Sequence, residues 1–189
     1  MVSSKLDLLL RDFQPRPSLT TTVTEITKPR FPVIDAHNHL GDAFGDLTQS
    51  WLARPATDLL AIMDASGVQA MIDLDGQSGE KLDRELAHFQ EPYPDRFVVF
   101  SGLDYDNFAT DRNVGETEAK RLREAVAKGA RGLKVWKTLG LRLRDHAGKL
   151  IPIDDERLDP MWQAAGELNV PVLIHIADPV AFFEPLDRF

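Results

Sequence analysis

Five short apolar runs recur along the chain, and segments of helical character separate them. Each run is rich in Val, Ile, Leu or Phe and is bounded by Gly, Pro or polar residues, which is typical of buried strands. The predicted strands begin at residues 33–35 and continue with 68–74, 97–103, 132–136 and 170–176. The spacing leaves room for a helix between each pair.

Helix signals fill these gaps. Thr57 is the expected N-cap of the first helix, and Gly67 is its expected end. Asp159-Pro160 places a proline in the first turn of the last one. The predicted helices cover residues 57–66, 80–89, 116–128 and 159–168, with a short one at 5–13. Strands and helices that alternate in this way predict an α/β fold of parallel strands with right-handed crossovers.

Five parallel strands fit either an open sheet or the first five β/α units of a TIM-type (β/α)8 barrel, which needs eight strands and about 250 residues. No glycine fingerprint for a dinucleotide or a phosphate follows any strand, which disfavours an open nucleotide-binding sheet. Residues 1–30, which are rich in Pro, Ser and Thr, are predicted to be an N-terminal extension. Residues 31–189 are predicted to be the barrel domain, incomplete at its C-terminal end.

The amino-acid composition limits the partners and the metal ligands that the chain can have. The chain has 189 residues, 43% hydrophobic and 28% charged, as in an ordinary globular protein. A net charge of −8 argues against nucleic acid or an anionic membrane as a partner. Because there is no cysteine, a metal would have to be held by His, Asp, Glu or a modified Lys. The leucine run near residue 9 is too short and too charged for a signal peptide, so we expect a cytoplasmic protein.

Two histidines close the first strand. Side chains alternate along a strand, so His37 and His39 should point the same way, with Asn38 turned away. Two neutral imidazoles suit Zn, and also Fe, Ni or Cu. They stand at the carboxyl end of a strand, where α/β proteins bind ligands. The alternative is a pair of surface or turn histidines without a metal.

A third histidine, His175, stands near the carboxyl end of the fifth strand. In a closed barrel, strands one and five lie across from each other, so inward side chains can converge. Three protein ligands and a water form a catalytic zinc arrangement. The alternative for His175 is a packed core residue.

Three segments resemble the amidohydrolase superfamily. They are Ile-Asp-Ala-His-Asn-His at 34–39, Gly-Leu-Lys-Val at 132–135 and Val-Leu-Ile-His at 172–175. The resemblance is to the amidohydrolase-related (amidohydrolase 2) branch, which includes aminocarboxymuconate-semialdehyde decarboxylase, and it covers residues 31–189. It implies a distorted (β/α)8 barrel with His37 and His39 as metal ligands. It also implies that His175 is a third ligand, or a catalytic neighbour of the metal.

One departure from the family pattern is large. Family members carry a further His on strand six and an Asp on strand eight, where the Asp binds the metal and acts as general acid/base. This chain ends at Phe189, soon after strand five. We therefore expect it to be a piece of a longer barrel, with a natural truncation as the alternative. An arc of five strands would leave apolar edges.

Three residues around the fourth strand are further candidates. Some branches of the superfamily carboxylate a lysine on strand four, which makes Lys134 a candidate; the alternative is a lysine that pairs with a carboxylate or reaches solvent. Lys137 is predicted to meet a substrate carboxylate, and Trp136 to form a pocket wall. A solvated lysine and a core tryptophan are the alternatives.

Together these features predict metal-dependent hydrolysis of a C–N or C–O bond in a small, carboxylate-bearing substrate. Zn is the expected metal, with Mn or Fe also possible; the ion would polarise a carbonyl and lower the pKa of its water toward ~7. Non-oxidative decarboxylation on the same metal is one alternative. Another is an inactive truncated barrel that acts as a binding module, and the isolated fragment is expected to lack activity. A homo-oligomer is compatible with the sequence.

Overall fold

The computed structural model describes residue 9 and residues 22–43, 50–106, 108 and 110–179. Residues 28–177 form one compact unit, and residues 1–27 group with 178–189 in another. The helix predicted at 5–13 lies outside the described residues except for Leu9. The predicted boundary between an extension and a barrel domain stays a prediction.

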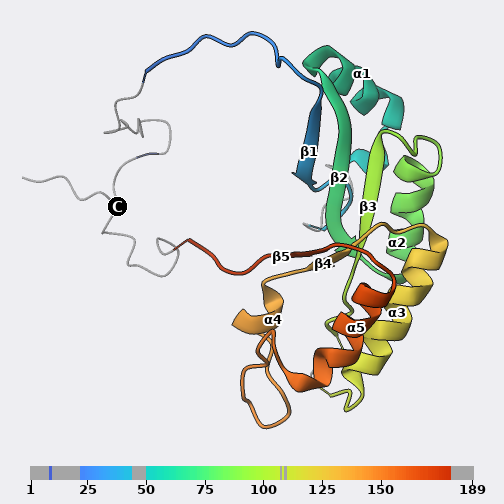
Figure 1. Cartoon of the computed structure of the whole chain (residues 1–189), viewed down its shortest axis with the longest axis vertical. Coiled ribbons are helices and arrows are strands. Elements are labelled where there is room, and N and C mark those ends of the chain that lie inside the picture. Colours follow the sequence, from blue (N-terminus) through green and yellow to red (C-terminus); the bar gives the residue numbers. More distant parts are fainter. Residues whose placement is uncertain (1–8, 10–21, 44–49, 107, 109, 180–189) are drawn as a thin grey trace, which may run out of the picture. The chain divides into compact units, whose positions relative to one another are not determined.

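Five strands form one parallel sheet in chain order, as Figure 1 shows. They are β1 (Val33–Asn38), β2 (Val68–Gln77), β3 (Phe97–Gly102), β4 (Leu133–Val135) and β5 (Val172–Ile174). Every neighbouring pair is parallel, which confirms the predicted connections. The result is a half-barrel with alternating helices, consistent with a partial (β/α) barrel of the TIM type.

Four helices of seven residues or more follow the predicted order. They are α1 (Ala56–Ser66), α2 (Gly79–Glu85), α3 (Val114–Lys128) and α5 (Asp159–Glu167). In Figure 1 they lie on one side of the strands. A π-helical turn, Leu86–Gln90, extends α2, and the one-turn α4 (Thr138–Leu141) follows β4. Short 3-10 turns cover Trp51–Ala53 and Glu156–Leu158.

Helix boundaries differ from the prediction by one to a few residues, for example at the start of α3, and the N-cap of α1 is a different residue. Pro55, not Thr57, occupies the N-cap of α1, and its carbonyl accepts a hydrogen bond from Asp58 N at 3.0 Å. The fixed φ of proline suits the entry to a helix, so the chain turns two residues earlier than the threonine suggested. Gly67 ends the helix in the left-handed conformation (φ 72°), as predicted.

β2 is longer than its apolar run. The residues after Leu74 were expected to form a loop, but β2 continues to Gln77. Asp75 and Gly76 are buried there, and the Asp75 carboxylate accepts a backbone hydrogen bond from Ala43. This bond satisfies the polar side chain inside the sheet, which an apolar pattern could not predict.

The apolar core lies in two clusters of buried side chains. One joins α1, α2 and β3 through residues that include Leu59, Met63, Leu82, Phe89 and Phe97. The other joins α3, α5 and β4 through Leu122, Leu133, Leu158 and Met161 among others. Both hold helices to the sheet, so the strand ends stand on a packed support. Among the described residues, no helix combines the length and the apolar character that crossing a membrane would need.

Candidate active site

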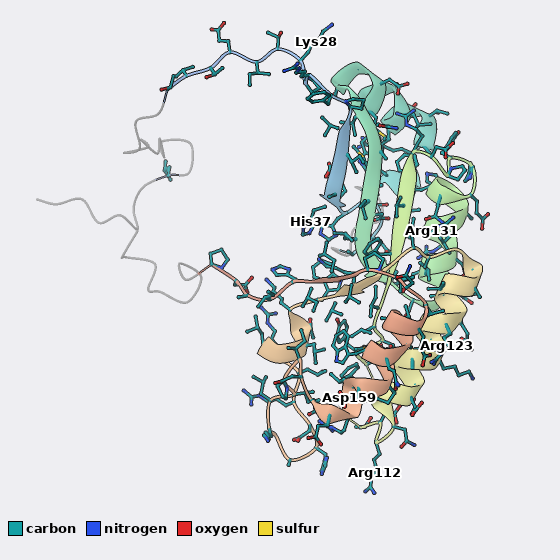
Figure 2. The ribbon with its side chains drawn as sticks, viewed as in Figure 1. Lys28, His37, Arg112, Arg123, Arg131 and Asp159 are labelled. Carbon is teal, nitrogen blue, oxygen red and sulfur yellow. The ribbon has the colours of Figure 1, made fainter. Side chains whose placement is uncertain are left out.

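The first site element is the end of β1. The His37 and His39 ring centroids lie 5.4 Å apart, with an angle of 66° between the rings. Asp35 steadies this turn: its carboxylate accepts hydrogen bonds from His37 N, at 3.2 Å, and from the Asn38 side chain. Figure 2 shows His37 at the carboxyl end of β1. The two imidazoles therefore lie side by side at the carboxyl end of β1.

Asp75 on β2 holds the second of these histidines. His39 Nδ1 lies 3.2 Å from Asp75 Oδ1, and the carboxylate is almost completely buried. Because a carboxylate accepts hydrogen bonds, Nδ1 carries the proton and Nε2 bears the lone pair. A carboxylate behind a histidine is the usual support of a metal-binding imidazole. The predicted strand ended at residue 74, so this role of Asp75 was not predicted; its one signal was its position after a buried strand.

Trp136 stands between the histidines of β1 and the histidine that follows β5. Its ring is stacked on His39, with centroids 5.1 Å apart, and its centroid is 6.2 Å from that of His175. The indole Nε1 donates to the Asp75 carbonyl at 3.0 Å, and the Trp136 backbone N–H donates to the Tyr105 hydroxyl at 2.9 Å. These bonds fix the ring as a wall shared by both sides of the site.

The pairing of β5 with β4 brings His175 to the same edge of the sheet. Its backbone N–H donates to the Val135 carbonyl at 2.9 Å, and the residue is half-buried. Burial lowers the pKa of His37, and the nearby Lys134, His39 and His175 lower it further, whereas Asp35 raises it. Electrostatic influence of this kind requires the groups to be close. The three predicted histidines thus gather at one edge of the sheet.

Lys134 on β4 is the buried lysine next to this group. Its side chain is 0% exposed, and Nζ has no hydrogen-bond partner among the described residues. Nζ lies 5.2 Å from the centroid of the Trp136 ring, and burial lowers the pKa of the amine. The side chain therefore lies near the Trp136 ring and does not reach solvent. Its carboxylation stays a prediction.

The donor set fits a divalent transition metal. A depressed pKa keeps the His37 imidazole neutral, as a ligand must be, and Asp75 orients His39. Neutral imidazoles suit Zn or Fe, whereas Mn prefers carboxylate and water oxygens, so these histidines by themselves favour Zn or Fe. The assignment of His37, His39 and His175 as ligands stays a prediction.

A cavity of about 430 Å³ opens beside this cluster. Its walls include Asp42, Asp75, Lys81, Tyr105 and Trp136. The predicted wall residue Trp136 is thus part of it. Lys137 is half-buried, precedes α4, and is not one of the residues that line this cavity. Lys81 and Tyr105 had no signal in the sequence, because a helix surface lysine and a strand-end tyrosine are common without function.

Behind the cavity lies a buried acidic group. Asp42, Asp75 and Glu85 each offer one carboxylate oxygen, and these atoms all lie within 4.8 Å of one another. Burial, together with Asp73, Asp75 and Asp42, raises the pKa of Glu85 to about 10. Burial and Asp75 raise the pKa of Asp73 to about 7. Glu85 was read only as part of a predicted helix, since nothing in its local sequence marks it.

The family model for amidohydrolases of the amidohydrolase 2 type matches residues 34–188. The chain belongs to this family. The match spans every strand described above, from β1 to β5, and it includes His37, His39 and His175. No curated protein sequence matches the chain.

Two solved structures are similar to this amidohydrolase chain. One is 5-carboxyvanillate decarboxylase from Novosphingobium aromaticivorans with bound manganese and 3-methoxy-4-hydroxy-5-nitrobenzoic acid; it has 19% identity and a TM-score of 0.50, over 86% of this chain and 57% of that one. The other is a probable 2-pyrone-4,6-dicarboxylic acid hydrolase from Acinetobacter baumannii with citric acid bound; it has 14% identity and a TM-score of 0.46, over 77% of this chain and 49% of that one. The chain thus spans about half the length of each.

Proposed function

We propose that the protein is a metal-dependent hydrolase of the amidohydrolase family that cleaves a C–N or C–O bond in a small substrate. The observation that carries this proposal is that His37 lies beside His39, and that His39 and His175 both lie beside Trp136, at the carboxyl ends of the strands. Membership of the amidohydrolase family adds support. The activity is proposed for the whole protein, because the chain spans about half of its structural neighbours.

The three histidines would hold the ion through neutral imidazole nitrogens. When bound, the ion supplies a Lewis acid that polarises a carbonyl and lowers the pKa of a water. Asp75 keeps the His39 ring in one orientation and on one tautomer. His175, half-buried beside Trp136 after β5, is the candidate to contact the reacting group as well as the ion.

The cavity beside the site would hold the substrate. Trp136 gives it an apolar wall, and Tyr105 and Lys81 supply a hydroxyl and a positive charge. A carboxylate on the substrate would be attracted to Lys81 in the cavity wall, and to Lys137 if its side chain swings toward the mouth. This pairing of an apolar wall with a cation suits a small carboxylic acid.

Non-oxidative decarboxylation is the second candidate. The structural neighbour at a TM-score of 0.50 is a decarboxylase with bound manganese, and it shares the barrel fold. Both reactions would use the same histidines. A panel of lactones, amides and aromatic acids, assayed with the longest natural form of the protein, separates them. Carbon dioxide release without hydrolysis would assign the protein to the second reaction.

Metal content is the direct test of the site. The 189-residue chain, purified without chelator, should carry close to one equivalent of Zn, Mn or Fe, measured by plasma mass spectrometry. His37→Ala removes a ligand and should lower metal retention at least tenfold. The matched control is His146→Ala, since that histidine is exposed in a loop and should leave metal content unchanged.

The absence of bound metal would contradict the proposal. A metal-free chain, whose His37→Ala variant has the same fold and the same metal content as the wild type, would remove the enzyme hypothesis. It would favour the alternative of a truncated barrel that acts as a binding module.

A further inference from the structure

The buried acidic group brings three carboxyl groups together, and only Asp42 has a cation beside it among the described residues. Asp42 is 9% exposed, Asp75 is 1% and Glu85 is 0%. Arg84 contacts Asp42 at 3.4 Å, and its own side chain is half-exposed. Burial of several ionised carboxylates is costly unless a positive charge or protons compensate them.

Glu85 is the clearest sign of a missing partner. It is fully buried on α2, and both of its carboxyl oxygens lack a hydrogen-bond partner among the described residues. One Asp73 oxygen nearby is also buried and without a partner. Native proteins rarely leave such oxygens unsatisfied, so each one needs an explanation.

The backbone leaves space for this arrangement at Gly41. A Cβ on Gly41 would overlap Asp75 Oδ2 and the Glu85 carboxylate. The two acids therefore face each other across a position without a side chain. Asp75 has two separate tasks: Oδ1 lies against the His39 ring, and Oδ2 faces Glu85.

We propose that Asp42, Asp75 and Glu85 form a second cation site, separate from the histidines, for a hard divalent cation of the Ca²⁺, Mg²⁺ or Mn²⁺ kind. Carboxylate oxygens are the ligands that these ions prefer. Asp42 and Asp75 also line the cavity, which gives an ion a way in from solvent. The three ligands come from the loop after β1, from β2 and from α2, so a bound ion would clamp these elements together.

Lanthanide luminescence tests this site without relying on activity. The probe is Tb³⁺ alone, which prefers oxygen ligands to imidazole nitrogen. Trp136 is a suitable sensitiser, because its Nε1 donates to the Asp75 carbonyl at 3.0 Å. Excitation of tryptophan in the full 189-residue chain should give a saturable Tb³⁺ emission that Ca²⁺ or Mn²⁺ competes away.

Variants decide which residues hold the probe. Glu85→Gln keeps the shape and removes the charge, so it should weaken Tb³⁺ binding at least tenfold. Asp42→Asn should weaken it as well, which guards against a folding defect in one variant. The matched control is Glu80→Gln, on the same helix but exposed, and it should bind Tb³⁺ as the wild type does. Circular dichroism and the urea midpoint check that each variant is folded.

Two results would overturn the proposal. One is a Tb³⁺ emission of the wild type that is no greater than that of Glu85→Gln. This result would mean that protons alone neutralise the acidic group. The other is emission lost in His37→Ala and kept in Glu85→Gln, which means that the probe sits at the histidines. Failure here leaves the histidine site untouched, because that site is tested by transition-metal content in the previous experiment.

Discussion

At the scale of single residues, carboxylates of one chemical kind have different environments. Asp35 accepts hydrogen bonds at the end of β1, and Asp75 supports His39. Within the part of the chain that the structure describes, Glu85 has no hydrogen-bond partner for either oxygen. The sequence cannot separate these cases, because each depends on which elements close over the side chain. Burial, more than residue type, decides whether a carboxyl keeps its proton.

Glu85 gives a prediction for stability against pH. Its pKa is raised from 4.5 to about 10 in the folded chain. The folded state therefore keeps a proton that the unfolded chain releases above about pH 4.5. The stability that this proton contributes is complete below pH 4.5 and is lost as the pH rises toward 10.

Without divalent cations, the free energy of unfolding of the wild type should thus fall between pH 5 and 8, by up to about 1.4 kcal/mol per pH unit from this group. Glu85→Gln should flatten that fall, although Asp73, with a pKa of about 7, leaves some slope. Urea unfolding with chelator at several pH values measures it. Glu80→Gln should keep the wild-type slope; an equal slope in Glu85→Gln would show that the carboxyl is ionised.

At the scale of elements, the ends of β2 and β3 depend on close backbone packing. Gly76 adopts a left-handed φ of 63°, and a Cβ on Gly102 would overlap its carbonyl oxygen. This approach lets β2 run past its apolar residues and carry Asp75 to the site. A glycine near a strand end thus has a structural task that the strand pattern alone does not reveal.

Gly102→Ala should therefore destabilise the chain by about 2–3 kcal/mol, because the overlap is with backbone and cannot be relieved by a rotamer change. Gly166→Ala is the matched control. That glycine lies in α5 with open space around it, so alanine should stabilise by about 0.5–1 kcal/mol. Denaturant midpoints of both variants test the pair. A Gly102→Ala midpoint equal to the wild type would mean that β2 and β3 are farther apart.

At the scale of the whole molecule, the sheet is a half-barrel whose outer strands carry exposed apolar side chains. Ile34 on β1 is 61% exposed, and Ile176, just after β5, is 79% exposed. Among the described residues, β1 and β5 each pair with one strand only. Such edges favour association with other strands. We expect self-association of the 189-residue chain through them, which is how a homo-oligomer would arise.

Ile176→Lys should weaken this association, since a charge at a strand edge opposes pairing. Ile62→Lys is the matched control: that residue is 51% exposed but lies on α1, away from the sheet edges. Sedimentation velocity at several concentrations should show wild type and control as oligomers, with Ile176→Lys shifted toward monomer. A wild type that stays monomeric throughout would contradict the role of the edges.

Much of the architecture could be predicted from the sequence. The predictions that were wrong concern single residues and the ends of elements. Apolar runs located all five strands, and their alternation with helices gave the parallel order. Thr57 was wrong as a cap because Pro55 already fixes the turn. The end of β2 was wrong because the Asp75 carboxylate accepts a hydrogen bond from the distant Ala43, and because Gly76 packs closely against Gly102.

The sequence by itself determined the order of the elements, the family, and the presence of histidines at two strand ends. Local sequence patterns encode these properties, so they can be predicted without the structure. Only the tertiary structure decided that Asp75 stands behind His39 and that Trp136 lies between His39 and His175. It also decided that Glu85 is buried with no hydrogen-bond partner among the residues it describes. Those relations join residues tens of positions apart, and the packing of strands and helices, which no local pattern encodes, brings them together.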